Sequence, residues 1–442
     1  MPEPVLNSGD TAWILVSAAL VMLMLPGLAL FYGGMTRVKS SLNMIMMVFG
    51  ALCVIGIVWI LYGYSMTFGT DTGLGLIANP LEFFGLGGLM ADDPTATYPV
   101  MAFVAFQAMF VAVTAALIAG AIADRAKFGV WLVFAAIWAT VVYFPVAHWV
   151  WGPGGWMLEG RGPLNGVPVI DFAGGTVVEI ASGASALGLA FVLGRRLGWP
   201  KTPMRPHNMT LVMLGAGLLW FGWFGFNAGS ALSAGNTAAV VFVNTFGATC
   251  AAALGWLLLE KIRDGHATSL GAASGIVAGA VAITPSGSAV SPIGAMILGA
   301  IAGVVCALAV GLKYRFAYDD SFDVVAVHLV GGLIGTLLIG LLATEAAPAG
   351  VNGLFYGGGT DQLRSQAIAA FVVLFYTLVV TVIIGKLIAV TVGFRVSEDD
   401  EISGVDRIIH AEAAYELTES GAGGRFAGVG AAAAARTAQE EA

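Results

Sequence analysis

The residues most able to do chemistry in this chain are two ionisable side chains inside strongly apolar stretches. Glu179 lies in DFAGGTVVEIASG, residues 171–183, and His328 lies in FDVVAVHLVGG, residues 322–332. An ionisable group within a membrane segment costs about 2.5–3.5 kcal/mol even on a lenient insertion scale, so such residues usually serve a function. A carboxyl and an imidazole that meet there could pass a proton between them. The other interpretation is a buried hydrogen bond that only joins two helices.

The composition of the chain places these residues in a membrane. Of its 442 residues, 58% are hydrophobic and 10% are charged, whereas soluble domains carry roughly 25% charged residues. About 20 apolar residues cross a bilayer as one helix. We therefore predict an all-α polytopic membrane protein with 11 transmembrane helices, near residues 11–33, 42–66, 98–122, 128–150, 174–194, 209–232, 236–262, 268–286, 291–312, 322–343 and 366–394.

The basic residues predict the orientation of the chain, because cytoplasmic loops carry an excess of Lys and Arg. One set of alternate loops holds 12 basic residues, and the opposite set holds two, Arg161 and Arg364. We therefore expect a multi-pass protein of the cell membrane (inner or plasma membrane) with its N-terminus outside and its C-terminus in the cytoplasm. The 12 residues are Arg37, Lys39, Arg125, Lys127, Arg195, Arg196, Lys201, Arg205, Lys261, Arg263, Lys313 and Arg315.

The two halves of the chain resemble each other. When Glu179 is aligned with His328, Gly183 falls on Gly332. Each half has five spans, an odd number, so the second copy must enter the membrane from the opposite side. Such inverted repeats place their functional site near the midplane, between the halves. At a rise of 1.5 Å per residue, Glu179 and His328 lie about 8 Å and about 9 Å from opposite boundaries, so we expect them to face each other.

This inverted 5+5 repeat, followed by a C-terminal helix, divides the chain into six regions. Asp171 and Asp323 precede spans five and ten, where either could cap a helix N-terminus. The tail becomes rich in Gly and Ala from Gly421, which predicts disorder. The regions are an extracellular N-terminus (1–10), the first five-helix repeat (11–194), a cytoplasmic linker (195–208), the second repeat (209–343), a loop with the eleventh helix (344–394) and a cytoplasmic tail (395–442).

Aromatic residues form a second candidate site, and their types alone leave its role open. Phe106 and Phe110 lie one helical turn apart in span three, Phe226 lies in span six, and Trp151 ends span four. Such residues usually pack helices or anchor them at the membrane surface, but a desolvated aromatic face can also hold a cation by about 2 kcal/mol. The sequence has no Cys/His cluster with metal-ligand spacing and no Walker loop. We predict a carrier or channel without a metal, a cofactor or enzymatic activity.

Several stretches together resemble the ammonium transporter family (Amt/Mep/Rh), and specifically its Amt branch. The resemblance covers essentially residues 10 to 415, with all 11 spans in order. The stretches are PGLALFYGGM (26–35), AFQAMF (105–110), VWGPGG (150–155), DFAGGTVVEIASG (171–183), WFGFNAGSA (223–231), GAASGIVAGAVAITP (271–285) and FDVVAVHLVGG (322–332).

The resemblance implies a homotrimer in the lipid bilayer, with one conduction path for ammonium or methylammonium in each subunit and no nucleic-acid partner. It implies an outer substrate site of Trp151, Phe110 and Ser230, supported by Asp171. Phe110 and Phe226 match a stacked pair that closes the pore, with Phe106 beside them.

The resemblance also implies a pore lined by two facing residues. His328 matches the second member of the family's twin-histidine motif, and Glu179 stands where most bacterial members have the first histidine. This departure puts the proton path in doubt rather than the substrate. The segment GVDRIIHAEAAY, residues 404–415, resembles the family's cytoplasmic tail, which can communicate with PII-type regulatory proteins.

The mechanism we expect begins with deprotonation of ammonium near the Phe gate, and continues with passage of neutral ammonia through the pore. If the Glu/His pair carries the proton separately, transport is electrogenic. An ammonium sensor with low flux is an alternative, and so is a channel for a neutral gas. Trp151 and Ser230 argue against the gas channel, because a neutral gas needs no cation site.

Overall fold

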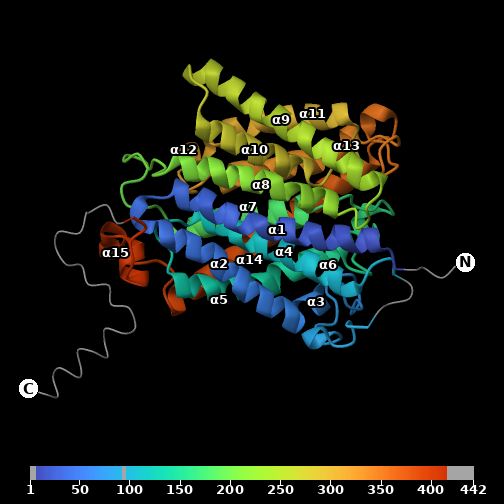
Figure 1. Cartoon of the computed structure of the whole chain (residues 1–442), viewed down its shortest axis with the longest axis horizontal. Coiled ribbons are helices and arrows are strands. Elements are labelled where there is room, and N and C mark those ends of the chain that lie inside the picture. The colour runs from blue at the N-terminus through green and yellow to red at the C-terminus, as the bar shows by residue number, and fades with distance from the viewer. Residues whose placement is uncertain (1–5, 92–95, 416–442) are drawn as a thin grey trace, which may run out of the picture.

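The computed structural model describes residues 6–91 and 96–415, and every regular element within these residues is a helix (Figure 1). Residues 416–442, which include the end predicted to be disordered from Gly421, lie outside the described residues, as do residues 92–95 and residues 1–5 of the predicted N-terminal region. The helices lie side by side in one bundle, with α1 beginning at one end and α15 at the other (Figure 1). We call these the N-terminal end and the tail end.

The 11 predicted spans are all present as helices, in order and with ends within a few residues of those predicted. Ten are long and apolar enough to cross a membrane, and the eighth, α10, is a shorter apolar helix. The spans are α1 (Ser8–Met35), α2 with α3 (Ser41–Val58, Tyr64–Phe68), α4 (Val100–Ile118), α5 with α6 (Phe128–Trp138, Phe144–Trp151), α7 (Ala181–Leu193), α8 (Met209–Gly229), α9 (Asn236–Asp264), α10 (Ser269–Ile283), α11 with α12 (Pro292–Ala309, Leu312–Phe316), α13 (Val330–Leu342) and α14 (Asp361–Thr391).

Four spans contain a short π-helical stretch. Two of these stretches join α2 to α3 and α5 to α6, at Trp59–Gly63 and Ala139–Tyr143. The other two begin spans five and ten, at Gly175–Ile180 and Val325–Leu329. Such stretches are rare and are often found at functional sites. The last two contain Glu179 and His328, the residues singled out from the sequence.

Spans five and ten have the same local structure, as the alignment of the two halves predicts. Gly174 (φ 114°), directly before the first of these stretches, and Asp323 (φ 62°), two residues before Val325, each take a left-handed conformation. They lie 149 positions apart, as Glu179 and His328 do. The two spans run antiparallel, because Arg196, just after span five, bonds to Asp319, just before span ten.

Small residues let these two spans touch where they cross. A Cβ atom on Gly183 would lie 2.3 Å from the backbone nitrogen of Leu329. A Cβ atom on Gly332, the aligned residue, would lie 2.9 Å from the Cβ of Glu179. Backbones approach this closely in membrane proteins only where glycine or another small residue stands at the contact. The crossing thus brings Glu179 and His328 to one level of the bundle.

Aspartates cap both spans, but one of them is not the residue we predicted. The carboxylate of Asp171 accepts backbone N–H groups at the start of span five, which confirms its predicted role. At span ten the N–H of Val325 donates to Asp320, so the prediction for Asp323 is wrong. Asp323 lies in the left-handed turn itself, and its carboxylate contacts the ammonium group of Lys313 at 2.7 Å.

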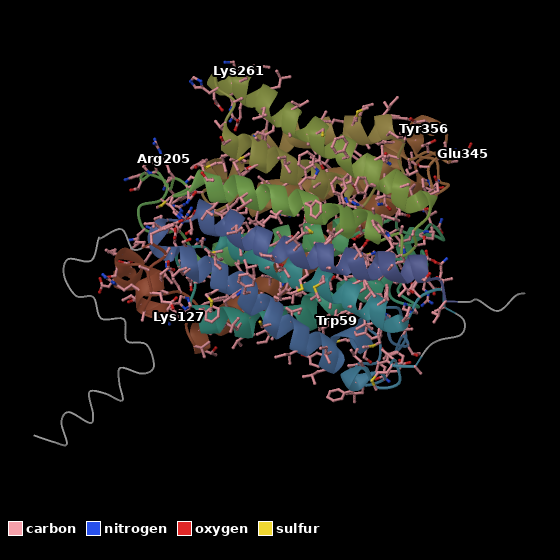
Figure 2. All side chains as sticks on the ribbon, viewed as in Figure 1. Trp59, Lys127, Arg205, Lys261, Glu345 and Tyr356 are labelled. Atoms are coloured by element: carbon pink, nitrogen blue, oxygen red, sulfur yellow. The ribbon has the colours of Figure 1, made fainter. Side chains whose placement is uncertain are left out.

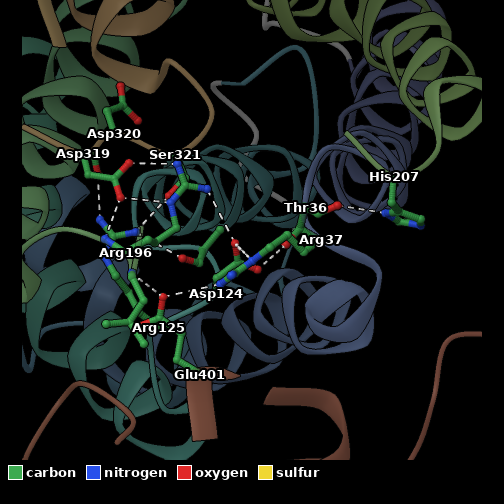
Figure 3. Close-up of polar contacts among 12 residues, drawn as sticks. Thr36, Arg37, Asp124, Arg125, Arg196, His207, Asp319, Asp320, Ser321 and Glu401 are labelled. Atoms are coloured by element: carbon green, nitrogen blue, oxygen red, sulfur yellow. Dashed lines mark hydrogen bonds and ion pairs between the residues drawn. The ribbon is translucent and has the colours of Figure 1, made fainter. Parts of the chain in front are cut away.

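A network of ion pairs, buried except for the partly exposed Arg37, joins the spans at the tail end (Figure 3). Arg37 binds Asp124 at 2.9 Å, and Arg196 binds Asp319 at 2.8 Å and Asp124 at 3.5 Å. Burial disfavours the charged form of Asp319, but the hydrogen bonds and charge of Arg196 outweigh it and hold the pKa of Asp319 below its usual value. Asp319 therefore remains charged at neutral pH, and the network ties the segments that follow spans one, three and five to the start of span ten.

The described part of the tail packs against this network. Glu401 in α15 (Glu398–Ser403) accepts from Arg395 at 2.8 Å and from the backbone of Leu197 at 2.8 Å. Asp406 accepts the N–H groups of Leu42 and Asn43 at the start of α2. The tail therefore lies across the end of the bundle, where Lys127, Arg205 and Lys261 also lie, whereas Glu345 lies at the opposite end (Figure 2).

The glycine contact at the crossing of spans five and ten gives a testable prediction. The variant Gly183→Ala must shift either the backbone of Leu329 or its own helix, and overpacking of this kind costs about 1–3 kcal/mol. We expect thermal unfolding of the detergent-purified protein at a clearly lower temperature. The control is Gly56→Ala in α2, where a Cβ atom would meet nothing within 4 Å, so its melting temperature should not fall. Equal melting temperatures for the two variants would contradict the close crossing.

Candidate functional site

Four aromatic residues predicted for the site form one continuous cluster. Phe110 of α4 and Phe226 of α8 stack face to face, with ring centroids 4.1 Å apart and ring planes 20° apart. Phe106 meets Phe110 edge to face at 4.8 Å, and Trp151, at the end of α6, does so at 6.0 Å. The three phenylalanines are almost fully buried, whereas Trp151 is partly exposed. The cluster thus leads from the N-terminal end of the bundle into its interior.

Ser230 adds a hydroxyl beside this cluster, as the resemblance implied. Its Oγ donates to the carbonyl oxygen of Phe226 at 2.8 Å, and the side chain is partly exposed. A hydroxyl that donates its one proton keeps two lone pairs free to accept. The exposed mouth of the cluster therefore offers aromatic rings and one hydrogen-bond acceptor, which are the groups that suit a small cation carrying N–H donors.

Asp171 is a structural anchor for this mouth. Its carboxylate accepts N–H groups from Gly174 (2.9 Å), Gly175 (2.5 Å) and Thr176 (2.9 Å), and also the hydroxyl of Thr176. Its backbone carbonyl accepts the indole N–H of Trp151 at 2.8 Å. The carboxylate is thus engaged by protein donors, and Asp171 acts on the mouth of the site through Trp151 and the start of span five.

Gln366 of α14 is a residue of this region that the sequence analysis missed. Its side chain is fully buried and forms two hydrogen bonds with Ile170, accepting the backbone N–H at 2.8 Å and donating to the carbonyl at 2.7 Å. It also donates to the carbonyl of Thr336 in α13 at 3.3 Å. Gln366 therefore joins the segment before Asp171 to span ten. The signal in the sequence that could have indicated this residue was a polar amide within a long, mostly apolar helix.

A second set of polar residues supports Phe226 from behind. The indole N–H of Trp223 donates to the hydroxyl of Thr284 at 2.9 Å, and that hydroxyl lies 3.1 Å from the side-chain oxygen of Asn227. The Trp223 ring packs 5.8 Å from the ring of Phe226. These buried contacts join α8 to the end of α10 and restrict the position of the Phe226 ring. The sequence analysis did not single out Trp223, Asn227 or Thr284.

A narrow cavity lies between Trp223 and His328. The space open to the centre of a water-sized molecule is about 20 Å³, which is close to what a single water needs. The cavity has room for one small molecule at a time, and its walls are mostly apolar. Its lining includes Val113, Leu117, Leu219, Phe31, Trp223 and His328.

Glu179 and His328 meet within the bundle, as the inverted repeat predicted. The Nδ1 atom of His328 lies 2.7 Å from Oε2 of Glu179, a distance typical of a charge-assisted hydrogen bond. Glu179 is fully buried and His328 is 4% exposed. The second carboxylate oxygen, Oε1, is buried with no hydrogen-bond partner among the described residues. The pair can exist as carboxylate with imidazolium or as carboxylic acid with imidazole, and one proton hop interconverts them.

Comparisons with known proteins agree with this architecture. The model of the Ammonium Transporter Family matches residues 12–415. An ammonium transporter of Mycobacterium tuberculosis (strain ATCC 25618 / H37Rv) is 56% identical over 434 residues, covering 93% of this chain and 91% of that protein. An ammonium transporter of Bacillus subtilis (strain 168) is 43% identical over 415 residues, covering 93% of this chain and 99% of that protein.

Solved structures show the same fold. The crystal structure of Saccharomyces cerevisiae Mep2 superposes with a TM-score of 0.81 at 33% identity, covering 89% of this chain and 91% of that one. A structure described as a sensor Amt protein superposes with a TM-score of 0.82 at 28% identity, covering 90% of this chain and 97% of that one. The family match spans the aromatic mouth, the cavity and the buried pair, so this chain is a multi-pass membrane protein that belongs to the ammonium transporter family.

Proposed function

We propose that this protein transports ammonium by binding NH4⁺ at the aromatic mouth, removing a proton and conducting NH3 through the narrow cavity. The observation that carries the proposal is the continuous order of parts along the bundle. A partly exposed Trp151 leads to the stacked Phe110 and Phe226, then to the cavity and to the Glu179–His328 pair. The N-terminal end faces the outside in this proposal, because basic residues gather at the tail end and cytoplasmic loops are the basic ones.

The mouth suits recruitment of a small cation. Desolvated aromatic faces attract cations by about 2 kcal/mol, and the free lone pairs of Ser230 can accept from an ammonium N–H. Glu82 lies in a loop at the same end, and its negative charge raises the local concentration of cations. Asp171 supports recruitment by holding the indole of Trp151 in place.

The stacked rings and the cavity favour the neutral form of the substrate. A small ion that loses its water in an apolar passage pays a large desolvation cost, whereas a neutral molecule with few polar groups pays far less. The Phe110–Phe226 stack closes the passage at a ring separation of 4.1 Å, so a ring must move for a molecule to pass. We infer that ammonium gives up its proton at this gate, beside Phe106.

The Glu179–His328 pair gives the released proton its own route. When the acid form of Glu179 passes its proton to Nδ1 of His328, the carboxyl O–H bond breaks, an N–H bond forms, and the pair becomes carboxylate with imidazolium. The 2.7 Å separation makes this a short hop, and strongly interacting groups of this kind titrate as a unit. Net movement of one charge with each ammonia makes transport electrogenic.

The assembly proposed for this function is a homotrimer in the cell membrane, with one pore in each subunit. Exposed apolar side chains cover the outer faces of several spans, among them Phe242, Leu254, Met296 and Phe375, and such faces suit lipid or a neighbouring copy. The described part of the tail lies across the tail end, where we place the cytoplasm and a surface for a PII-type regulatory protein.

Substitution of Trp151 tests the recruitment site. We expect Trp151→Leu to raise the KM for methylammonium about thirtyfold, because it removes a cation–π contact of about 2 kcal/mol. Trp151→Phe keeps an aromatic face but loses the hydrogen bond to Asp171, so its KM should lie between those of Trp151→Leu and the wild type. Uptake of radiolabelled methylammonium into proteoliposomes measures both. An unchanged KM in Trp151→Leu would contradict the proposed site.

Substitution of Glu179 tests the proton route. We expect Glu179→Gln to abolish the ammonium-induced current on a solid-supported membrane, because an amide does not take up and release a proton, while flux of neutral ammonia persists. Glu179→His should restore the current, since imidazole can relay a proton. A full current in Glu179→Gln would reduce this residue to pore lining. A wild type with neither current nor flux would instead favour a sensor, the function named for one structural relative.

A further inference from the structure

His148 is a buried ionisable residue that the proposed transport mechanism does not use. It lies in α6, one helical turn before Trp151, and its side chain is fully buried. Its Nδ1 atom lies 2.8 Å from the carbonyl oxygen of Thr67, at the end of span two. Its Nε2 atom lies 3.2 Å from Oδ1 of Asp71, in the loop that follows. Both ring nitrogens therefore face oxygen atoms.

These two partners determine which protons the His148 ring needs for both hydrogen bonds. A backbone carbonyl only accepts hydrogen bonds, so Nδ1 carries a proton. Asp71 also accepts from the backbone of Gly73 at 3.1 Å and of Gly75 at 3.2 Å. Although burial opposes its charge, hydrogen bonds from His148, Gly75 and Gly73 hold the pKa of Asp71 below its usual value. An ionised carboxylate only accepts, so the contact at Nε2 is a hydrogen bond only while that nitrogen also carries a proton.

The ion pair lies inside a tight interface between the loop after span two and the end of α6. The indole N–H of Trp149 donates to the carbonyl oxygen of Leu76 at 2.8 Å. The backbone N–H of Trp156 donates to the carbonyl oxygen of Gly75 at 3.2 Å. A Cβ atom on Gly154 would lie 2.8 Å from the Cβ of Asp71. Trp151 lies between these contacts along the chain, so the loop holds the helix end that presents its indole.

We propose that Thr67, Asp71 and His148, here named the His148 clamp, hold Trp151 in its cation-binding position only while His148 carries both ring protons. His148 is thus a positioning residue that makes ammonium recruitment dependent on the pH outside, an inference that rests on the proposed transport function. When Nε2 loses its proton, a lone pair faces the Asp71 carboxylate, and their repulsion loosens the loop from the helix end.

The surroundings leave Asp71 as the charged group that decides the state of His148. In the same loop, Glu82 is turned to Thr70, accepting its N–H at 2.5 Å. In the loop after α6, Glu159 pairs with Arg161 at 2.8 Å. On the other side of Trp151, Asp171 is occupied by the start of span five. The side chain of Asp71 is 15% exposed, so protons from the outer solution can reach the pair.

The sign of the pH dependence follows from the two groups. Histidine is the side chain whose charge changes nearest to neutral pH, so the clamp is complete on the acid side and opens as the outer pH rises. Asp71 would release the clamp only in acid, because its pKa lies below its usual value. Across the range in which histidine changes its charge, the state of His148 therefore controls the clamp.

The test measures the KM for ammonium of the full chain in proteoliposomes at about pH 6 and about pH 8. In the wild type we expect the KM to rise about fivefold at the higher pH, because the loss of one typical hydrogen bond weakens binding by about this factor. The maximal rate should change little. Asp71→Asn should keep a low KM at both pH values, because the asparagine amide can donate a hydrogen bond to a neutral imidazole. Asp71→Ala and His148→Gln should show the high KM at both values.

A second measurement keeps the proposal testable if a variant folds poorly. The wild type has five histidines. In the ¹⁵N NMR spectrum of the histidine-labelled wild type, the ring of His148 should show two protonated nitrogens at about pH 6 and lose this signature by about pH 8. Its signal is assigned by its absence in His148→Gln. The missing signature would overturn the proposal, and so would a pH-independent KM in the wild type or wild-type pH dependence in Asp71→Asn. A wild type without any transport would refute the proposed function separately, whatever the NMR signature.

Discussion

The contact between Glu179 and His328 is the constraint on which the rest of the structure depends. Two ionisable groups can stay inside an apolar bundle only when each compensates for the lost hydration of the other. The 2.7 Å hydrogen bond meets this condition, but only if two helices from different halves of the chain cross with almost no space between them. Gly183 and Gly332 provide that approach, and the Asp171 and Asp320 caps set where the two helices begin.

The same constraint explains how polar groups are distributed along the bundle. At the N-terminal end, backbone and side-chain hydrogen bonds from Asp171 and Gln366 hold an aromatic mouth without leaving a free charge in it. At the tail end, arginine–carboxylate pairs lock the chain segments together. Between the ends lies an apolar cavity with room for about one small molecule. In the proposed mechanism, the Glu179–His328 pair is thus the polar centre of a passage whose apolar walls favour a neutral molecule.

Much of this architecture could be predicted from the sequence, because membrane spans and intramembrane charges leave strong signals. The 11 spans followed from apolar length, and the meeting of Glu179 with His328 followed from the odd number of spans in each half. The cap at span ten did not follow, since Asp320 and Asp323 are both near its start and only the left-handed turn at Asp323 decides between them. Gln366 and His148 were missed because their partners are backbone atoms or loop residues distant in sequence.

The most direct test of the account is the ratio of charge to substrate in the wild type. Radiolabelled methylammonium uptake and integrated current would be measured on the same proteoliposomes, at several fixed membrane potentials. The account predicts about one elementary charge for each methylammonium taken up, since the pair returns to its starting state only by passing on one proton per cycle. Uptake with no accompanying charge, at every potential, would contradict a separate proton route through Glu179 and His328.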